Sequence, residues 1–125
     1  MTPEQLKART KRFALEIIAL VSKLPRTLVA EIIARQLVRC ATSVGANYRA
    51  ACRGRSRAEF AAKISIVLEE ADETLYWLEI LHESGVSTEK SVLEVMKEAG
   101  ELIAIFAASH KTARTLRVSQ APRDA

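Results

Sequence analysis

Residues 27–60 read TLVAEIIARQLVRCATSVGANYRAACRGRSRAEF, and this stretch decides the fold. Apolar side chains recur at helical spacing over residues 27–52, and only Gly45 weakens the helix, by about 1 kcal/mol relative to alanine. A short connection containing a glycine follows. Ser56 and Glu59 then have the spacing of a capping box, which predicts the start of another helix. Two long helices joined by so short a link must run antiparallel.

One further helix is predicted on each side of this pair. The boundary signals are a capping-box pattern at residues 2–5, a proline stop at Pro25, a glycine stop at Gly85 and a capping serine or threonine at 87–88. Because all the connections are short, successive helices must return along one another. The sequence therefore predicts an all-α protein with an antiparallel up-down-up-down four-helix bundle over residues 1–116 and a polar, frayed tail over residues 117–125.

Each predicted helix has one stripe of side chains that should face the core. In the first two helices the stripes comprise Leu6, Phe13, Ile17, Leu20, Leu24, Ile33, Leu37, Cys40, Val44, Tyr48 and Ala51. In the last two helices they comprise Phe60, Ile64, Val67, Leu68, Ala71, Leu75, Leu78, Val92, Met96, Ala99, Ile103, Phe106 and His110.

Composition fits one helical domain. The chain has 125 residues, of which 49% are apolar and only 5% aromatic. Cys40 and Cys52 lie on one predicted helix, about 18 Å apart by helical rise, so they cannot form a disulfide with each other. Neither a secretory signal nor an apolar run long enough to cross a bilayer is present. We therefore expect a protein of the reducing cytoplasm that does not enter membranes.

Basic side chains form a ribbon on the second predicted helix, on the side opposite its apolar stripe. The predicted nucleic-acid-binding residues are Arg35, Arg39, Arg49, Arg53, Arg55, Arg57 and Lys63. Arginines spaced along a helix can contact phosphates without reading bases. Two other interpretations stay open: the arginines pair with carboxylates of a neighbouring subunit, or they are simply solvated.

The third predicted helix carries apolar side chains on its outward side as well. The predicted oligomer interface consists of Ile66, Glu70, Glu73, Trp77 and Ile80. An apolar stripe that includes a tryptophan and is ringed by acids is typical of protein interfaces. Alternatively, the helices splay and Trp77 packs against its own chain. Pairing of like surfaces would give a dimer and pairing of unlike surfaces a ring, and the sequence leaves this open.

Signals of catalysis are weak. A di-iron bundle needs a Glu-x-x-His pair on each of two helices, whereas this chain has such a pair only at Glu79 and His82. Cys40 faces the predicted core, and no glycine-rich phosphate loop occurs. We therefore expect no enzyme activity, no metal and no cofactor.

The junction of the second and third helices resembles a known family. The matching residues are Gln36, Arg39, Ser43, Asn47, Arg53, Arg57, Glu59 and Phe60. Over residues 10–112 the chain is similar to the four-helix-bundle proteins encoded in 23S rRNA intervening sequences. This resemblance implies a cytoplasmic homopentamer. It also extends to the accessory variability determinant of diversity-generating retroelements, a basic pentameric barrel that binds nucleic acid and reverse transcriptase.

One departure from the family pattern adds positive charge. Family members often have Asn-Ile-Ala-Glu-Gly before the turn, whereas residues 47–54 of this chain read NYRAACRG, without the glutamate. The change favours an anionic partner. The first functional hypothesis is therefore a homo-oligomeric, non-catalytic accessory module that binds RNA or DNA through the arginines of the second helix. The alternative is a structural or protein-partner scaffold in which these arginines meet Glu70 and Glu73 of the next subunit.

Overall fold

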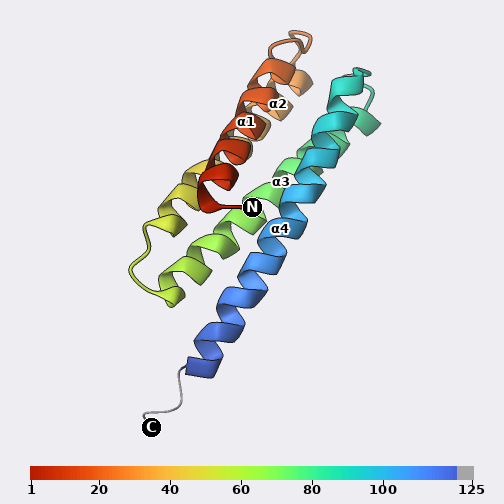
Figure 1. The fold of residues 1–125 in the computed structure, drawn as a ribbon. Helices are drawn as coiled ribbons and strands as arrows, with labels where there is room; N and C mark the ends of the chain where they lie inside the picture. Colours follow the sequence, from red (N-terminus) through yellow and green to blue (C-terminus); the bar gives the residue numbers. More distant parts are fainter. Residues whose placement is uncertain (121–125) are drawn as a thin grey trace.

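The computed structural model describes the backbone of residues 1–120 and the side chains of residues 1–115. It contains four helices: α1 (Pro3–Val21), α2 (Leu28–Cys52), α3 (Arg57–Glu83) and α4 (Lys90–Gln120). Successive helices run antiparallel in a single bundle (Figure 1). No strand occurs among residues 1–120. The predicted all-α four-helix bundle is confirmed.

Side-chain caps fix the starts of α1 and α3. The Thr2 hydroxyl accepts a hydrogen bond from the Gln5 N–H at 3.1 Å, and the Gln5 side chain accepts one from the Thr2 N–H at 2.8 Å. This completes the predicted capping box. At α3, Ser56 caps Glu59 as predicted, but the Glu59 carboxylate accepts from the Arg55 N–H at 2.6 Å. The glutamate therefore ties down the connection itself.

The start of α2 and the end of α3 also follow local chemistry, whereas α1 ends at Val21, before the predicted stop at Pro25. Thr27 caps α2 by accepting from the Ala30 N–H at 3.2 Å. Gly85 has a φ of 79°, a conformation that glycine adopts without strain, and it follows the end of α3. α4 continues to Gln120, past the predicted end of the bundle at 116. The rest of the predicted tail, residues 121–125, lies outside the described residues.

The core confirms most of the predicted stripes. The predicted stripe positions within α1 and α2 are all buried, whereas Leu24 lies beyond the end of α1 at Val21 and is half-buried. In α3 three of the predicted core residues are only half-buried: Phe60, Leu68 and Leu75. The prediction for α4 was wrong in part, because Val95 and Leu102 are buried while Met96, Ile103 and His110 are half-buried. The buried face of α4 is thus rotated about the helix axis relative to the predicted face, because α4 packs mainly against α3.

An ion-pair cluster joins α1 to α4, the pair of neighbouring helices with the least mutual packing. The Arg9 guanidinium donates two hydrogen bonds to Glu98, at 2.8 and 2.6 Å, and one to Glu101 at 3.2 Å. The hydrogen bond to Glu98 is the main reason that the pKa of Arg9 lies above its ordinary value. Because the two hydrogen bonds to Glu98 are bidentate, they fix the position of α1 along α4.

α1 and α2 approach closely at Gly45. A methyl group placed on Gly45 would lie 3.2 Å from the Thr10 hydroxyl oxygen and 3.4 Å from the Thr10 Cβ. Gly100 provides a contrast, because a methyl group there would meet nothing within 4 Å. The two glycines have different roles: one allows two helices to touch, and the other only weakens an exposed helix.

We expect Gly45→Val to lower the free energy of unfolding by about 1–3 kcal/mol, because the branched side chain overlaps Thr10. The matched variant Gly100→Ala should raise it by about 0.5–1 kcal/mol through better helix propensity. Urea denaturation followed by circular dichroism measures both values. A Gly45→Val protein as stable as the wild type would contradict the close approach.

Candidate nucleic-acid interface

A groove of about 610 Å³ runs along the outer side of the α1 and α2 pair. Its lining consists of Glu4, Lys7, Ala8, Thr10, Lys11 and Ala14 from α1 with Thr42, Gly45, Ala46, Arg49 and Arg53 from α2 and its C-terminal cap. Small side chains predominate between the charged ones. The groove therefore combines a low floor with long cationic side chains that can fold over a bound anion.

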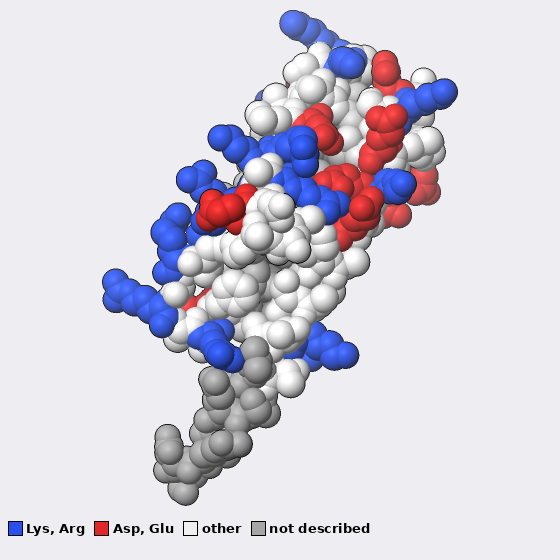
Figure 2. All heavy atoms as spheres, viewed as in Figure 1, with Lys and Arg blue, Asp and Glu red and all other residues white. Residues whose placement is uncertain are grey.

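Four cations line this groove. Lys7 and Lys11 come from α1, and Arg49 and Arg53 come from the C-terminal end of α2. Figure 2 shows Lys and Arg side chains gathered along the left edge of the molecule, over α1 and α2, whereas Asp and Glu side chains gather over α4. On the face seen in this view, the two kinds of charge are thus partly separated. We call the groove that these four residues line the basic groove.

Only two of the predicted phosphate-binding residues belong to the basic groove, namely Arg49 and Arg53. Three others, Arg35, Arg55 and Lys63, are exposed and are not among the described residues that line this groove. The remaining two are placed differently: Arg57 lines a separate pocket of about 400 Å³ between α3 and α4, and Arg39 turns toward α3.

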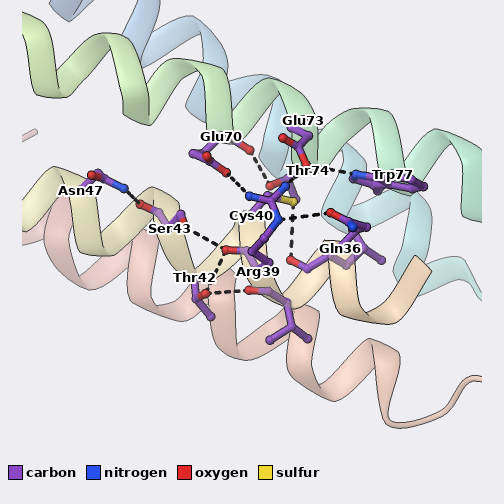
Figure 3. A network of polar contacts seen from close by, with 12 residues as sticks. Gln36, Arg39, Cys40, Thr42, Ser43, Asn47, Glu70, Glu73, Thr74 and Trp77 are labelled. Carbon is purple, nitrogen blue, oxygen red and sulfur yellow. Dashed lines mark hydrogen bonds and ion pairs between the residues drawn. The ribbon is translucent and has the colours of Figure 1, made fainter. Parts of the chain in front are cut away.

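Arg39 is the centre of a network between α2 and α3 (Figure 3). Its guanidinium donates to Glu70 at 3.3 Å and also to Glu73, and its Nε donates to the Gln36 side chain at 3.2 Å. The Trp77 indole N–H donates to the same Glu73 carboxylate at 3.2 Å. Arg39 therefore meets Glu70 and Glu73 of its own chain, where the scaffold hypothesis placed these carboxylates on the next subunit.

The other polar residues of the sequence motif continue this network along α2. The Ser43 hydroxyl donates to the Arg39 carbonyl at 2.9 Å, and the Asn47 side chain donates to the Ser43 carbonyl at 2.9 Å (Figure 3). These bonds stay within α2. In this chain, Gln36, Arg39, Ser43 and Asn47 all make intrachain contacts, and among these Arg39 makes the hydrogen bonds to α3.

The predicted oligomer interface is only partly exposed. Ile66 is exposed, while Trp77 and Ile80 are half-buried and pack against the core of their own chain. The predicted outward direction of Trp77 and Ile80 was therefore wrong in part, because α3 is in contact with neighbours on both sides. The oligomer interface itself stays a prediction. Other large apolar side chains are more exposed: Leu15, Leu28, Val29, Ile32, Tyr76 and Leu93.

The two thiols and the two histidines differ in burial. Cys40 is fully buried, and its burial raises the pKa of the thiol. Burial, followed by the neighbouring Cys52 thiol, raises the pKa of Tyr48 as well. His82 is exposed and His110 half-buried. Within residues 1–115 no three side chains of the ligating types come together as a metal site would require.

Comparison with known proteins places this arrangement in a family. Residues 5–108 match the model of the family described as 23S rRNA-intervening sequence protein. The chain belongs to that family. A crystal structure of a protein of unknown function from the S23 ribosomal protein family of Bacteroides thetaiotaomicron is also similar, with 32% identity and a TM-score of 0.77 over 84% of this chain and 97% of that one. None of the curated proteins matches the chain.

Membership of the 23S rRNA-intervening sequence protein family agrees with the resemblance found at the junction of α2 and α3. The prediction from sequence did not include Lys7 and Lys11, which line the groove. Their one-turn spacing was visible, but a single helix does not reveal which of its outward residues flank a neighbouring helix. No helix in the described part of the chain is both long and apolar enough to cross a membrane.

Replacing Glu73 with alanine should disturb the α2 and α3 network. Arg39 and Trp77 both lose an acceptor, and we expect the free energy of unfolding to fall by about 1 kcal/mol. The emission of Trp77, the only tryptophan, should change as well. Glu69→Ala is the matched control, since Glu69 is exposed on the same helix. Identical emission and stability in both variants would contradict the network.

Stability should fall at alkaline pH partly because of Cys40. Its raised pKa means that the folded chain keeps a proton that the unfolded thiol loses near its ordinary pKa of about 8.5. This stabilisation is complete below that pH and decreases above it. Urea denaturation at about pH 7.5 and pH 10 should therefore show a smaller decline for Cys40→Ala than for the wild type. Ser43→Ala, a nearby change on the same helix, should keep the wild-type decline, and equal declines in all three proteins would count against this role.

Proposed function

We propose that this protein is a homo-oligomeric, non-catalytic module that binds the phosphates of nucleic acid in the basic groove between α1 and α2. The proposal depends on one observation: two lysines on the α1 wall and two arginines on the α2 wall line the same groove, with small residues between them. Multiple cations along one groove suit a ligand with multiple phosphates.

Charge pairing supports the end of α2 over its middle. Arg49 and Arg53 take part in no ion pair within the described side chains, so they keep their charge for a ligand. Arg39 has two carboxylate partners and would have to break both contacts to reach a phosphate. The nucleic-acid contact is therefore assigned to the end of α2 near Arg53 and not to its middle.

Three features support the remaining parts of the proposal. The protonated, buried thiol of Cys40 is a poor nucleophile, which fits a protein without catalysis. Both cysteines are free, which fits a reducing cytoplasm. The exposed Leu28, Val29 and Ile32 at the start of α2 supply apolar surface for contact between copies of the chain. The family resemblance implies an assembly of five copies. A link to the accessory variability determinant would add a reverse transcriptase as partner.

A scaffold that binds only protein is the alternative. The same exposed apolar residues at the start of α2 favour it, since they would serve contact with another protein equally well. Under this alternative the basic groove is a solvated surface, and nucleic acid has no effect on the protein.

The double variant Arg49→Glu with Arg53→Glu should weaken binding of a labelled structured RNA by at least about tenfold at low salt, because each wall residue contributes a phosphate contact. The slope of log affinity against log salt should fall by about one for each phosphate that the variant no longer neutralises. The control is Lys23→Glu with Arg26→Glu, an equal charge change at exposed positions outside the groove. Fluorescence anisotropy measures both. Equal weakening in the two variants would sink the assignment to the groove.

A further inference from the structure

The cations of the basic groove have a regular spacing. Lys7 and Lys11 are one helical turn apart on α1, and Arg49 and Arg53 are one turn apart on α2 and its cap. A separation of four residues corresponds to a rise of about 6 Å. Each wall therefore offers a pair of charges at a step similar to that between neighbouring phosphates of one strand. A nucleic-acid strand lying along the groove would present a phosphate to each cation in turn.

Apart from its cationic side chains, the groove has no side chain suited to reading or stacking bases. Among the side chains that the structure describes, its lining contains no aromatic residue and no asparagine, glutamine or histidine. The Thr10 hydroxyl already donates to the carbonyl groups of Leu6 and Lys7, both at 3.0 Å. Sequence readout uses amides, arginines in a groove of DNA or stacking on aromatic rings. The basic groove therefore lacks the amide and aromatic side chains of base readout and relies on its cations, which suit phosphates.

The aromatic side chains lie elsewhere in the bundle. Tyr48 and Phe106 are both buried, with ring centroids 5.5 Å apart. Tyr76 and Trp77 pack edge to face on α3, which lines no part of the groove. An unpaired strand bound in the groove would thus find no ring on which to stack its bases.

We infer that the ligand of the basic groove is the sugar-phosphate backbone of base-paired RNA or DNA, bound without regard to base sequence. This inference rests on the proposed function and specifies the form of nucleic acid. A site that recognises phosphates alone favours the ligand with the highest linear charge density, and a duplex carries about one charge per 1.7 Å of axis. Proteins that prefer unpaired strands usually add stacking, which this groove lacks.

Glu4 restrains the site. Its carboxylate lies 3.1 Å from the Lys7 ammonium and lines the same groove, so it repels an incoming phosphate and partly neutralises one cation. The Glu4 side chain is 83% exposed and makes no other ion pair within the described side chains. Removing the Glu4 charge therefore releases the Lys7 ammonium from its ion pair and does not disturb the packing of the core.

Fluorescence anisotropy on the full chain tests the inference with an RNA duplex of about 20 base pairs, a uridine homopolymer of matched length and inorganic polyphosphate as competitor. The duplex should bind at least about tenfold more tightly than the homopolymer, and duplexes of different sequence should agree within about twofold. Glu4→Gln should strengthen duplex binding by about twofold to fivefold. Glu89→Gln, an exposed change outside the groove, should leave it unchanged.

Different failures have different meanings in this experiment. A homopolymer that binds as tightly as the duplex, or affinities that differ by about tenfold between duplex sequences, would overturn the inference while leaving nucleic-acid binding intact. Polyphosphate that displaces the duplex at equal phosphate concentration would also overturn it, because the groove would then take any chain of phosphates. Binding of neither nucleic acid would remove the proposed function itself.

Discussion

The contact between Gly45 of α2 and Thr10 of α1 is the constraint on which the rest of the structure depends. Because Gly45 has no side chain, the two helices approach until a methyl group would be only 3.2 Å from the Thr10 hydroxyl. This close approach keeps the floor of the groove low and brings the cations of both helices to its walls. A larger residue would push the helices apart and widen the groove.

α2 carries out two tasks on two sides. Toward α3, Arg39 is held by Glu70 and Glu73, and the motif residues around it make bonds within their own chain. Toward α1, Arg49 and Arg53 line an open groove with their charges unpaired among the described side chains. Arginines that look alike in the sequence therefore have different roles. Those near the centre orient the helices, and those near the turn remain available to a ligand.

Local chemistry explains why the fold could be predicted. The capping box at Thr2, the serine cap at Ser56, the glycine after α3 and the apolar stripes depend on neighbours in the sequence, and they define helices and short links that permit one topology. The rotation of α4 could not be predicted in the same way. Val95 and Leu102 compete with Met96 and Ile103 for nearly the same face, and only packing against α3 decides between them.

The candidate site was predictable only in part for a related reason. Helical spacing places Arg39, Arg49 and Arg53 on the polar side of α2, but it does not specify which neighbouring helix each long side chain reaches. Lys7 and Lys11 gain significance only when α1 lies beside the end of α2. A departure from the family pattern, a more basic segment before the turn, was a second sequence signal that pointed to the groove end of α2.

If an assembly of this chain carries nucleic acid on its basic groove, light scattering of the purified full chain with and without an RNA duplex tests it most directly. We expect a particle larger than one chain that gains the mass of the duplex at low salt and releases it at high salt. A particle of constant mass in the presence of duplex at both salt concentrations, or a monomer, would contradict this function.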